Sequence, residues 1–258
     1  MGTRKAPVLF VGHGSPMNAI GDNRSRKEWK RMGEALGKPR VIIAVSAHWL
    51  THGLHVRRSA TNPQINDMYG FPEALYAVKY SPAGDIETAE KVMSALGEKA
   101  VEDNAWGIDH GVWAVLCNMY PEGDVPVVMV SVDDTASAAE QYNVGKRLAS
   151  LRNEGAMIVA SGNVVHNLRL VNWRMREGYP WADDFDNAIQ KAITEKRFDD
   201  VINYESIADH AMAVPTTEHF FPLLTAIGAT TTTDSVTVWN EYRELGSMSM
   251  TSYLWQET

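Results

Sequence analysis

The chain has 258 residues, of which 45% are hydrophobic and 22% charged, and these proportions are ordinary for a globular protein with a full core. Its formal net charge of −8 disfavours binding to nucleic acid or to anionic membranes, because both need clustered Lys and Arg. The single cysteine, Cys117, excludes an intrachain disulfide, and no apolar run approaches the roughly 20 residues of a membrane span, so we expect a cytoplasmic protein.

Short apolar runs alternate with longer amphipathic segments along the chain. In chain order the pattern predicts strand Val8–Val11, helix Arg24–Leu36, strand Val41–Ser46, helix Asp85–Leu96, strand Val125–Val132, helix Ala136–Leu151, strand Met157–Ala160, and helices Asp183–Lys196 and Thr217–Ile227. The strands are β-branched and apolar on both faces, as in a buried sheet. This alternation predicts the α/β class, with helices on both faces of the sheet.

The C-terminal part has a different pattern. Thr230–Asn240 and Ser247–Trp255 alternate apolar and polar residues, with Gly246 between them. Alternation with a period of two indicates strands, so we expect a terminal antiparallel pair and therefore a mixed sheet. No linker rich in Pro, Gly or Ser interrupts the chain, which favours a single domain over 1–258.

Histidines follow several of the predicted strands. His13 lies between two glycines after the first strand, His48 ends the run from Val41, and His166 comes shortly after Met157–Ala160. Open α/β sheets bind their ligands at the carboxyl ends of strands, and neutral imidazole is the commonest protein ligand of transition metals. The sequence therefore predicts one metal site assembled from distant parts of the chain.

Two further positions carry candidate residues. His110 lies in a glycine-containing loop, where the neighbouring Asp109 could orient an imidazole. Glu218 and His219 come directly after Thr217, which can cap a helix, and both are possible metal ligands.

The remaining histidines and the cysteine have simpler interpretations. His52 and His55 follow His48 without a convincing helical pattern, so we interpret them as surface groups or as supports of the ligands. His210 lies in a helical stretch and is interpreted as structural, and Cys117 as a buried structural thiol.

Six short motifs occur in a fixed order along nearly the whole chain. They are Gly12–Pro16 (Gly-His-Gly-Ser-Pro), Ser46–Trp49 (Ser-Ala-His-Trp), Tyr69–Pro72 (Tyr-Gly-Phe-Pro), Asp109–Trp113 (Asp-His-Gly-Val-Trp), Ser161–Asn167 (Ser-Gly-Asn-Val-Val-His-Asn) and Thr217–Phe220 (Thr-Glu-His-Phe). In this combination the chain resembles the class III extradiol ring-cleavage dioxygenases of the LigB type. It is most similar to their 4,5-DOPA extradiol dioxygenase branch.

The resemblance implies a single α/β domain around a mixed sheet, non-haem Fe(II) as the metal, with Zn(II) able to occupy the site, and a catechol and O2 as substrates. It implies His13, His48 and His219 as metal ligands, although the wider class uses a carboxylate as third ligand, which keeps Glu218 open. His166 matches the acid/base histidine, and a further role as ligand stays open for it. His110 matches another active-site histidine.

In the implied reaction, His166 takes a proton from the catechol and later returns it, with His110 as the second choice. A zinc-dependent hydrolase of an amide or a lactone is the main alternative, because histidine-rich sites on α/β sheets serve both chemistries. A metal-binding protein without catalysis is the second alternative. We expect a monomer or a weak homodimer, and the sequence does not fix the physiological catechol.

Overall fold

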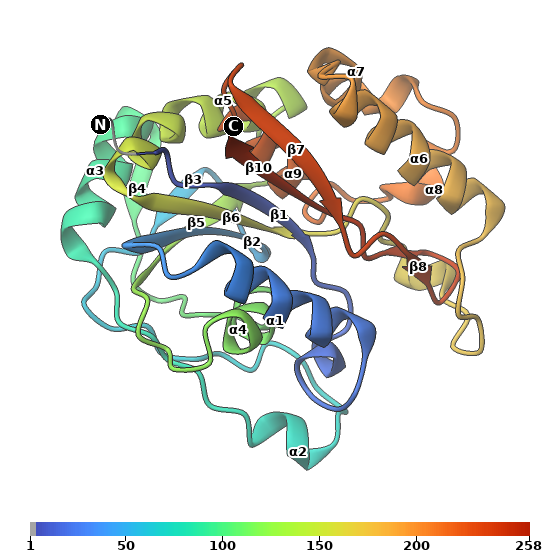
Figure 1. Cartoon of the computed structure of the whole chain (residues 1–258), viewed down its shortest axis with the longest axis horizontal. Helices are drawn as coiled ribbons and strands as arrows, with labels where there is room; N and C mark the ends of the chain where they lie inside the picture. The colour runs from blue at the N-terminus through green and yellow to red at the C-terminus, as the bar shows by residue number, and fades with distance from the viewer. Residues whose placement is uncertain (1–3) are drawn as a thin grey trace.

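The computed structural model describes residues 4–258 and is built around an eight-stranded sheet in the order β4-β3-β5-β2-β6-β1-β10-β7 (Figure 1). Its strands are β1 Val8–Gly12, β2 Val41–Thr51, β3 Leu54–Val56, β4 Ala100–Glu102, β5 Val127–Asp133, β6 Ala156–Gly162, β7 Asp234–Trp239 and β10 Ser252–Glu257. Strands β5, β2, β6 and β1 run parallel, while β10 is antiparallel to β1 and β7 to β10. The predicted mixed sheet and its terminal antiparallel pair are confirmed.

Nine α-helices and several short elements complete the described residues. The helices are α1 Arg24–Leu36, α2 Glu73–Tyr76, α3 Ile86–Leu96, α4 His110–Met119, α5 Ala138–Leu148, α6 Pro180–Thr194, α7 Phe198–Ile202, α8 His210–Ala213 and α9 Phe221–Gly228. The short elements are the 3-10 turns η1 Pro16–Ala19, η2 Gly97–Lys99, η3 Ala149–Glu154, η4 Leu168–Leu170 and η5 Tyr204–Ser206, and a hairpin of β8 Arg243–Glu244 and β9 Met248–Ser249.

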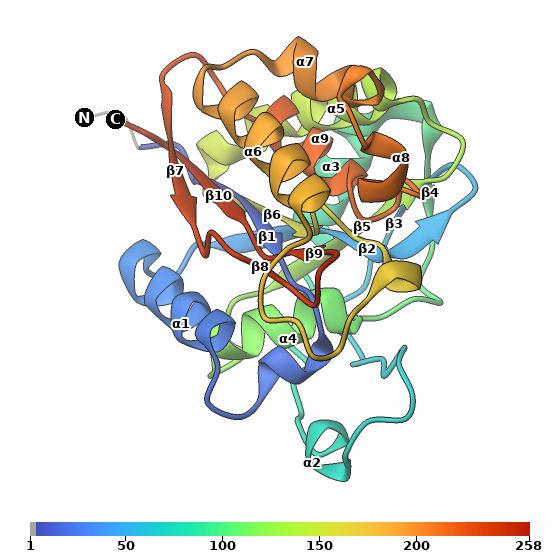
Figure 2. The same cartoon turned by 90° about the vertical axis from the view of Figure 1, so that its right-hand side faces the viewer.

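The sheet separates two hydrophobic cores. Successive residues of β1 alternate between them, with Val8 and Phe10 in one core and Leu9 and Val11 in the other. Helices α3, α5, α6 and α9 cover the first core, and α1 and α4 cover the second (Figures 1 and 2). The prediction of helices on both faces is confirmed.

Helix α1 has the predicted bounds because a capping residue precedes it and a glycine follows it. The Asn23 side chain accepts a hydrogen bond from the Arg26 N–H at 2.8 Å, which caps the first turn. Gly37 follows the last turn with a φ of 66°, a conformation that glycine adopts without strain.

Other bounds differ from the prediction. Helix α9 begins at Phe221 instead of Thr217, because Pro222 is accommodated in its first turn and residues 217–220 form a separate turn. The carbonyl of His219 in that turn accepts a hydrogen bond from the Asn163 N–H at 2.8 Å, which ties the turn to the end of β6. Helix α5 ends at Leu148 and continues as the 3-10 turn η3.

Cys117 is half-buried instead of buried, and burial raises the pKa of its thiol to about 12. Such a thiol stays protonated at neutral pH, in agreement with a structural role. Within residues 4–258 no helix is both long and apolar enough to cross a membrane.

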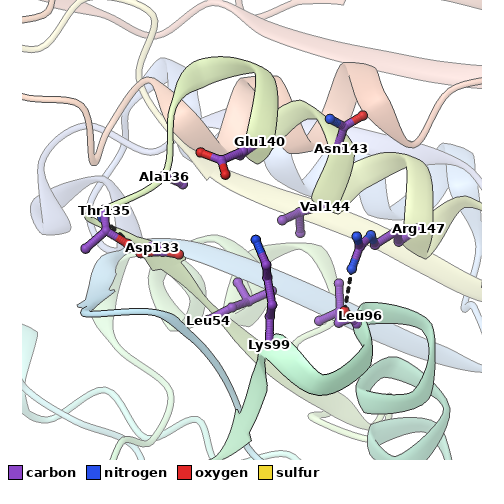
Figure 3. A pocket seen from close by; sticks show the side chains of 10 residues that line it. All are labelled: Leu54, Leu96, Lys99, Asp133, Thr135, Ala136, Glu140, Asn143, Val144 and Arg147. Atoms are coloured by element: carbon purple, nitrogen blue, oxygen red, sulfur yellow. Dashed lines mark hydrogen bonds between the residues drawn. The ribbon is translucent and has the colours of Figure 1, made fainter.

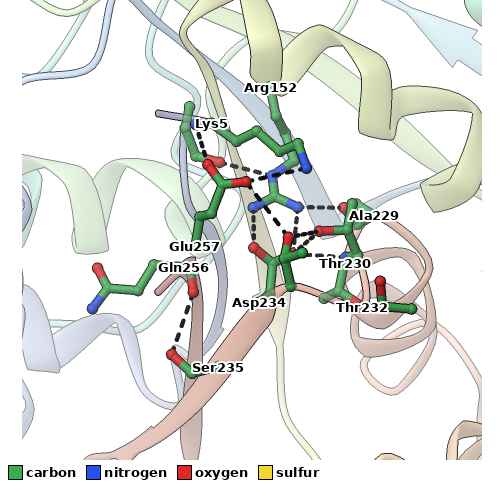
Figure 4. Close-up of polar contacts among 12 residues, drawn as sticks. Lys5, Arg152, Ala229, Thr230, Thr232, Asp234, Ser235, Gln256 and Glu257 are labelled. Atoms are coloured by element: carbon green, nitrogen blue, oxygen red, sulfur yellow. Dashed lines mark hydrogen bonds and ion pairs between the residues drawn. The ribbon is translucent and has the colours of Figure 1, made fainter. Parts of the chain in front are cut away.

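A buried ion pair lies where the parallel strands begin. Arg152 donates two hydrogen bonds to the Asp234 carboxylate at 2.7 and 2.8 Å, and both side chains are 0% exposed (Figure 4). The same guanidinium also donates to the carbonyls of Ala6 and Ala229 at 2.7 and 2.9 Å. The pair therefore links the start of β1 and the start of β7 to the turn before β6.

A hollow of about 190 Å³ lies between α3 and α5 and is lined by Lys99, Asp133, Glu140 and Arg147, among others (Figure 3). Its charges are of both signs, and Arg147 is already engaged by the Leu96 carbonyl at 2.6 Å. None of the histidines singled out by the sequence lines it.

Candidate metal centre

Five histidines from distant parts of the chain meet at the carboxyl ends of the parallel strands. His13 follows β1, His48 lies in β2, His110 begins α4, His166 follows β6, and His219 precedes α9. The ring centroids of His13, His48 and His219 lie 5.0 to 5.4 Å apart. The strand-end pattern predicted His13, His48 and His166 here, whereas His219 comes from a turn before a helix and was a candidate for a different reason.

Local backbone features bring the rings this close. The pairing of β2 with β5 shifts register between Val45 and Leu50, so that His48 lies in an irregular stretch of the strand. A Cβ atom on Gly111 would lie 2.9 Å from His48 Cδ2, and one on Gly162 would lie 2.1 Å from the His219 carbonyl oxygen. Both positions therefore require glycine for the observed approach.

The hydrogen bonds of His13 determine which ring nitrogen is free. Ser161 Oγ donates its hydrogen to the carbonyl of Gly111, so it can only accept from His13 Nδ1, which lies 2.9 Å away. The proton of the neutral ring is thus on Nδ1. The Nε2 lone pair of His13 is left for another partner.

The hydrogen bond of His219 also shows which of its ring nitrogens carries the proton. Its Nδ1 lies 3.1 Å from Glu218 Oε1, and a carboxylate can only accept, so Nδ1 carries the proton. Its Nε2 is buried and has no hydrogen-bond partner. A buried nitrogen without a partner is rare in folded proteins, so His219 Nε2 is a candidate metal ligand.

Asp67 supports two further rings. Its carboxylate accepts hydrogen bonds from the N–H and the Nδ1 of His110 at 2.9 and 2.8 Å. The same carboxylate lies 3.4 Å from His48 Nδ1. The Nε2 of His48 faces the Nε2 of His13 at 3.0 Å, so both nitrogens point into one space.

The protonation states of these groups follow from burial. Burial and the neighbouring histidines hold the pKa values of His13 and His219 well below the usual range of imidazole. Burial, reinforced by His110 and opposed by Asp67, lowers the pKa of His48 to about 3. Burial raises the pKa of Asp67, but its bonds to His110 outweigh that effect and the pKa is lowered. The rings are therefore neutral at pH 7, the form that binds metal.

His166 has a different relation to the cluster. Its ring stacks on that of His219 with centroids 3.5 Å apart and an angle of 7° between the planes. The two ring planes are therefore nearly parallel and do not converge. Burial, partly offset by Glu218, lowers the pKa of His166 to about 4.

The donor set fits a divalent transition metal. His13, His48 and His219 can each present one nitrogen within 4.8 Å of the others, and so can groups formed by His48, Asp67 and His110 and by His166, Glu218 and His219. Imidazole nitrogens suit iron and zinc. Nδ1–H groups held by a carboxylate or a hydroxyl are the usual support of metal-binding histidines.

The remaining histidines lie outside this cluster. His52 is 86% exposed, while His55 pairs with Asp103 at 3.0 Å. His210 begins α8, and its Nδ1 lies 3.1 Å from the carbonyl of Ile207. These positions agree with the interpretation of the three residues as surface or structural groups.

The sequence interpretation missed the carboxylate that supports His110. Asp109, the expected candidate, instead accepts hydrogen bonds from Ser46 Oγ and Trp106 Nε1 at 2.6 and 2.9 Å, and burial raises its pKa to about 6. The carboxylate that orients the His110 ring is instead that of Asp67, which lies in a loop 43 residues before His110. Its only signal in the sequence is its position two residues before the Tyr69–Pro72 motif.

Known proteins are similar to this chain over nearly its whole length. Curated relatives include the 4,5-DOPA dioxygenase extradiol of Escherichia coli K12, which is 41% identical over 98% of this chain and 95% of its own length. The protein of the same name from Beta vulgaris is 36% identical over 97% of each chain.

A crystal structure of an uncharacterized protein from Escherichia coli K12 has the same fold, with a TM-score of 0.85 and 38% identity over 97% of this chain and 99% of that one. The family model described as the catalytic LigB subunit of aromatic ring-opening dioxygenase matches residues 7–253. The chain therefore belongs to the LigB family and is an aromatic ring-opening dioxygenase.

Proposed function

We propose that the protein is an extradiol dioxygenase that opens the ring of a DOPA-like catechol with O2 to give a muconic semialdehyde, using Fe(II). The observation that carries the proposal is a set of three neutral imidazoles whose Nδ1 atoms face protein partners, while the Nε2 atoms of His13 and His48 face each other and that of His219 has no hydrogen-bond partner. The curated names of the relatives support the substrate class. Neither the family nor these relatives support the zinc hydrolase alternative.

In this proposal His13, His48 and His219 bind the metal. Glu218 is better suited to orient His219 than to replace it, because its Oε1 already accepts from His219 Nδ1 and from Thr216 Oγ1. A carboxylate behind a ligating imidazole fixes the ring and increases its basicity. Bound Fe(II) would hold the catechol oxygens and O2 together and supply the electron transfer that the side chains cannot perform.

His166 is the proposed proton carrier. With a pKa of about 4 it is neutral at pH 7, so its lone pair can accept the catechol proton that must leave before both oxygens bind. The charged ring can later return that proton to the reacting oxygen. Its stacking on His219 supports this role more than a role as fourth ligand.

His110 is the second proton-handling group. Asp67 holds its Nδ1–H, which fixes the tautomer and leaves its Nε2 free to exchange a proton. The His110 ring centroid lies 3.9 Å from that of His48 and therefore beside the proposed metal ligands.

Anaerobic loading with Fe(II), followed by addition of a catechol panel and O2, tests this proposal. We expect one O2 consumed per catechol and a yellow ring-opened product. The zinc-loaded protein is the matched control, because Zn(II) has no accessible second oxidation state and should bind catechol without oxidising it. An iron-loaded protein that consumes no O2 with any catechol would refute the proposal.

Two further properties belong to the proposal. We place the protein in the cytoplasm, which the single, half-buried cysteine supports. We expect a monomer or a weak homodimer.

A further inference from the structure

A hollow of about 200 Å³ opens beside the histidine cluster. It is lined by His166 and Glu218 and by parts of two turns, 167–169 and 215–216. We propose that this hollow binds the amino-acid end of the substrate, with Arg169 receiving the carboxylate and Glu218 the ammonium group. This inference rests on the proposed function, because it assumes a catechol that reacts beside His166.

Among the described residues that line the hollow, Arg169 is the only arginine or lysine. Among the contacts of residues 4–258, its guanidinium makes neither an ion pair nor a hydrogen bond. Arg57, by contrast, donates to four carbonyl and amide oxygens of the protein. A free guanidinium offers the planar pair of N–H donors that matches a carboxylate.

The turn that carries Arg169 is fixed by its buried neighbour Asn167. The Asn167 side chain accepts from the Arg169 N–H at 3.1 Å and donates to the carbonyl of Met212 at 2.8 Å. Its backbone is bonded twice to Ser247, at 3.1 and 2.7 Å. Because the backbone is already fixed, only the Arg169 side chain has to be ordered on a ligand, which limits the entropic cost of binding.

Glu218 supplies the opposite charge in the lining of the hollow. One oxygen of its carboxylate is occupied by Thr216 at 2.8 Å and by His219 at 3.1 Å, while the group as a whole still lines the hollow. A positive and a negative side chain around one small hollow complement a zwitterion. A simple catechol lacks both charges and gains neither contact.

Binding to the zinc-loaded protein tests the inference without turnover. L-DOPA, dopamine and 4-methylcatechol are titrated into the wild type and Arg169→Gln by calorimetry. We expect the Kd of L-DOPA to rise roughly tenfold in the variant, because a charge-assisted hydrogen bond is lost. The Kd values of dopamine and 4-methylcatechol, which have no carboxylate, should stay within about twofold.

Arg174→Gln is the matched control, because Arg174 is exposed on the same loop and lines a different hollow with Asp22 and Trp173. It should leave all three Kd values unchanged. Arg169→Lys should recover part of the L-DOPA affinity, since lysine keeps the charge and loses the planar donor pair.

The same variants in iron-loaded form separate this inference from the proposed function. A wild type that oxidises no catechol refutes the proposed function. A wild type that oxidises L-DOPA, with Arg169→Gln altering L-DOPA and 4-methylcatechol equally or not at all, refutes only the role of Arg169. We expect a selective rise in KM for L-DOPA with little change in kcat.

Discussion

The two ends of the parallel strands bury polar groups in opposite ways. Where the strands begin, Arg152 and Asp234 are fully buried, and each charge has its partner within the protein (Figure 4). Where the strands end, His13 and His219 are also buried, but their Nε2 atoms are not paired with an oppositely charged or accepting group: His13 Nε2 faces His48 Nε2, and His219 Nε2 has no hydrogen-bond partner. Burial therefore does not distinguish a structural site from a functional one, whereas incomplete pairing does.

Replacing a proposed ligand should have the largest effect at the histidine end. His13→Ala is expected to lose the bound metal and the ring-opening activity, because His48 and His219 would remain as only two of the three proposed ligands. Elemental analysis after Fe(II) loading and desalting measures the occupancy. His52→Ala is the control and should load fully, and a fully loaded His13→Ala would remove His13 from the ligand set.

Replacing the proposed proton carrier should separate metal binding from catalysis. His166→Ala should retain its metal but lose about 10²–10⁴-fold in kcat, the usual contribution of general acid/base catalysis. Oxygen consumption and metal content are measured on the same sample. Loss of the metal with an intact fold would instead make His166 a ligand.

Breaking the ion pair tests the opposite end of the strands. Arg152→Ala leaves the Asp234 carboxylate buried without its partner, which typically costs about 3–5 kcal/mol of unfolding free energy. Urea denaturation of the metal-free protein measures this loss. Arg58→Ala, which removes an exposed arginine with two carboxylate partners, should leave the midpoint nearly unchanged. Equal urea midpoints for Arg152→Ala and Arg58→Ala would show that the buried ion pair contributes no more to stability than an exposed one.

Removing the Asp67 carboxylate, which contacts both His48 and His110, should weaken metal binding without abolishing it. Asp67→Asn is expected to lower metal affinity about 10–100-fold, as is usual for groups that orient ligating histidines. Competition with a chelator measures the affinity. Asp103→Asn removes the carboxylate that pairs with His55 outside the cluster, so it should have no effect on the affinity.

The smallest expected effect concerns acid stability. Burial raises the pKa of Asp234, but its bonds to Arg152 and Thr231 outweigh that effect, and the pKa is lowered on folding. A carboxylate of this kind stabilises the protein above its unfolded pKa of about 4 and loses that contribution as the pH falls further. The unfolding free energy of the wild type should therefore fall more steeply below pH 4 than that of Asp234→Asn. If the unfolding free energies of the two proteins changed in parallel with pH, the Arg152–Asp234 pair would add no pH dependence to stability.

The sequence allowed a correct prediction wherever the signal was local. The α1 bounds follow from Asn23 and Gly37, and the parallel strands follow from apolar runs that are buried on both faces. Strand β3 was missed because its three residues, Leu54–Val56, are too few for a period to emerge, and it is formed through pairing with β4 and β5.

At the site, histidines at strand ends could be recognised because strand ends converge in an open sheet. Asp67 could not be recognised, because it lies in an irregular loop and meets His110 only through tertiary contact. The proposed choice of His219 over Glu218 also rests on the fold, because the sequence does not show that the Glu218 carboxylate contacts His219 Nδ1.

The cluster also has a consequence for the order of assembly. Its proposed ligands are separated by about 200 residues of chain, and the turn that carries His219 is tied to the end of β6 by the Asn163 backbone. A growing polypeptide therefore cannot complete the site until most of the sheet is in place, so metal capture should come late. Once captured, the ion would fasten the first strand to the last helix and raise the melting temperature in proportion to the logarithm of its free concentration.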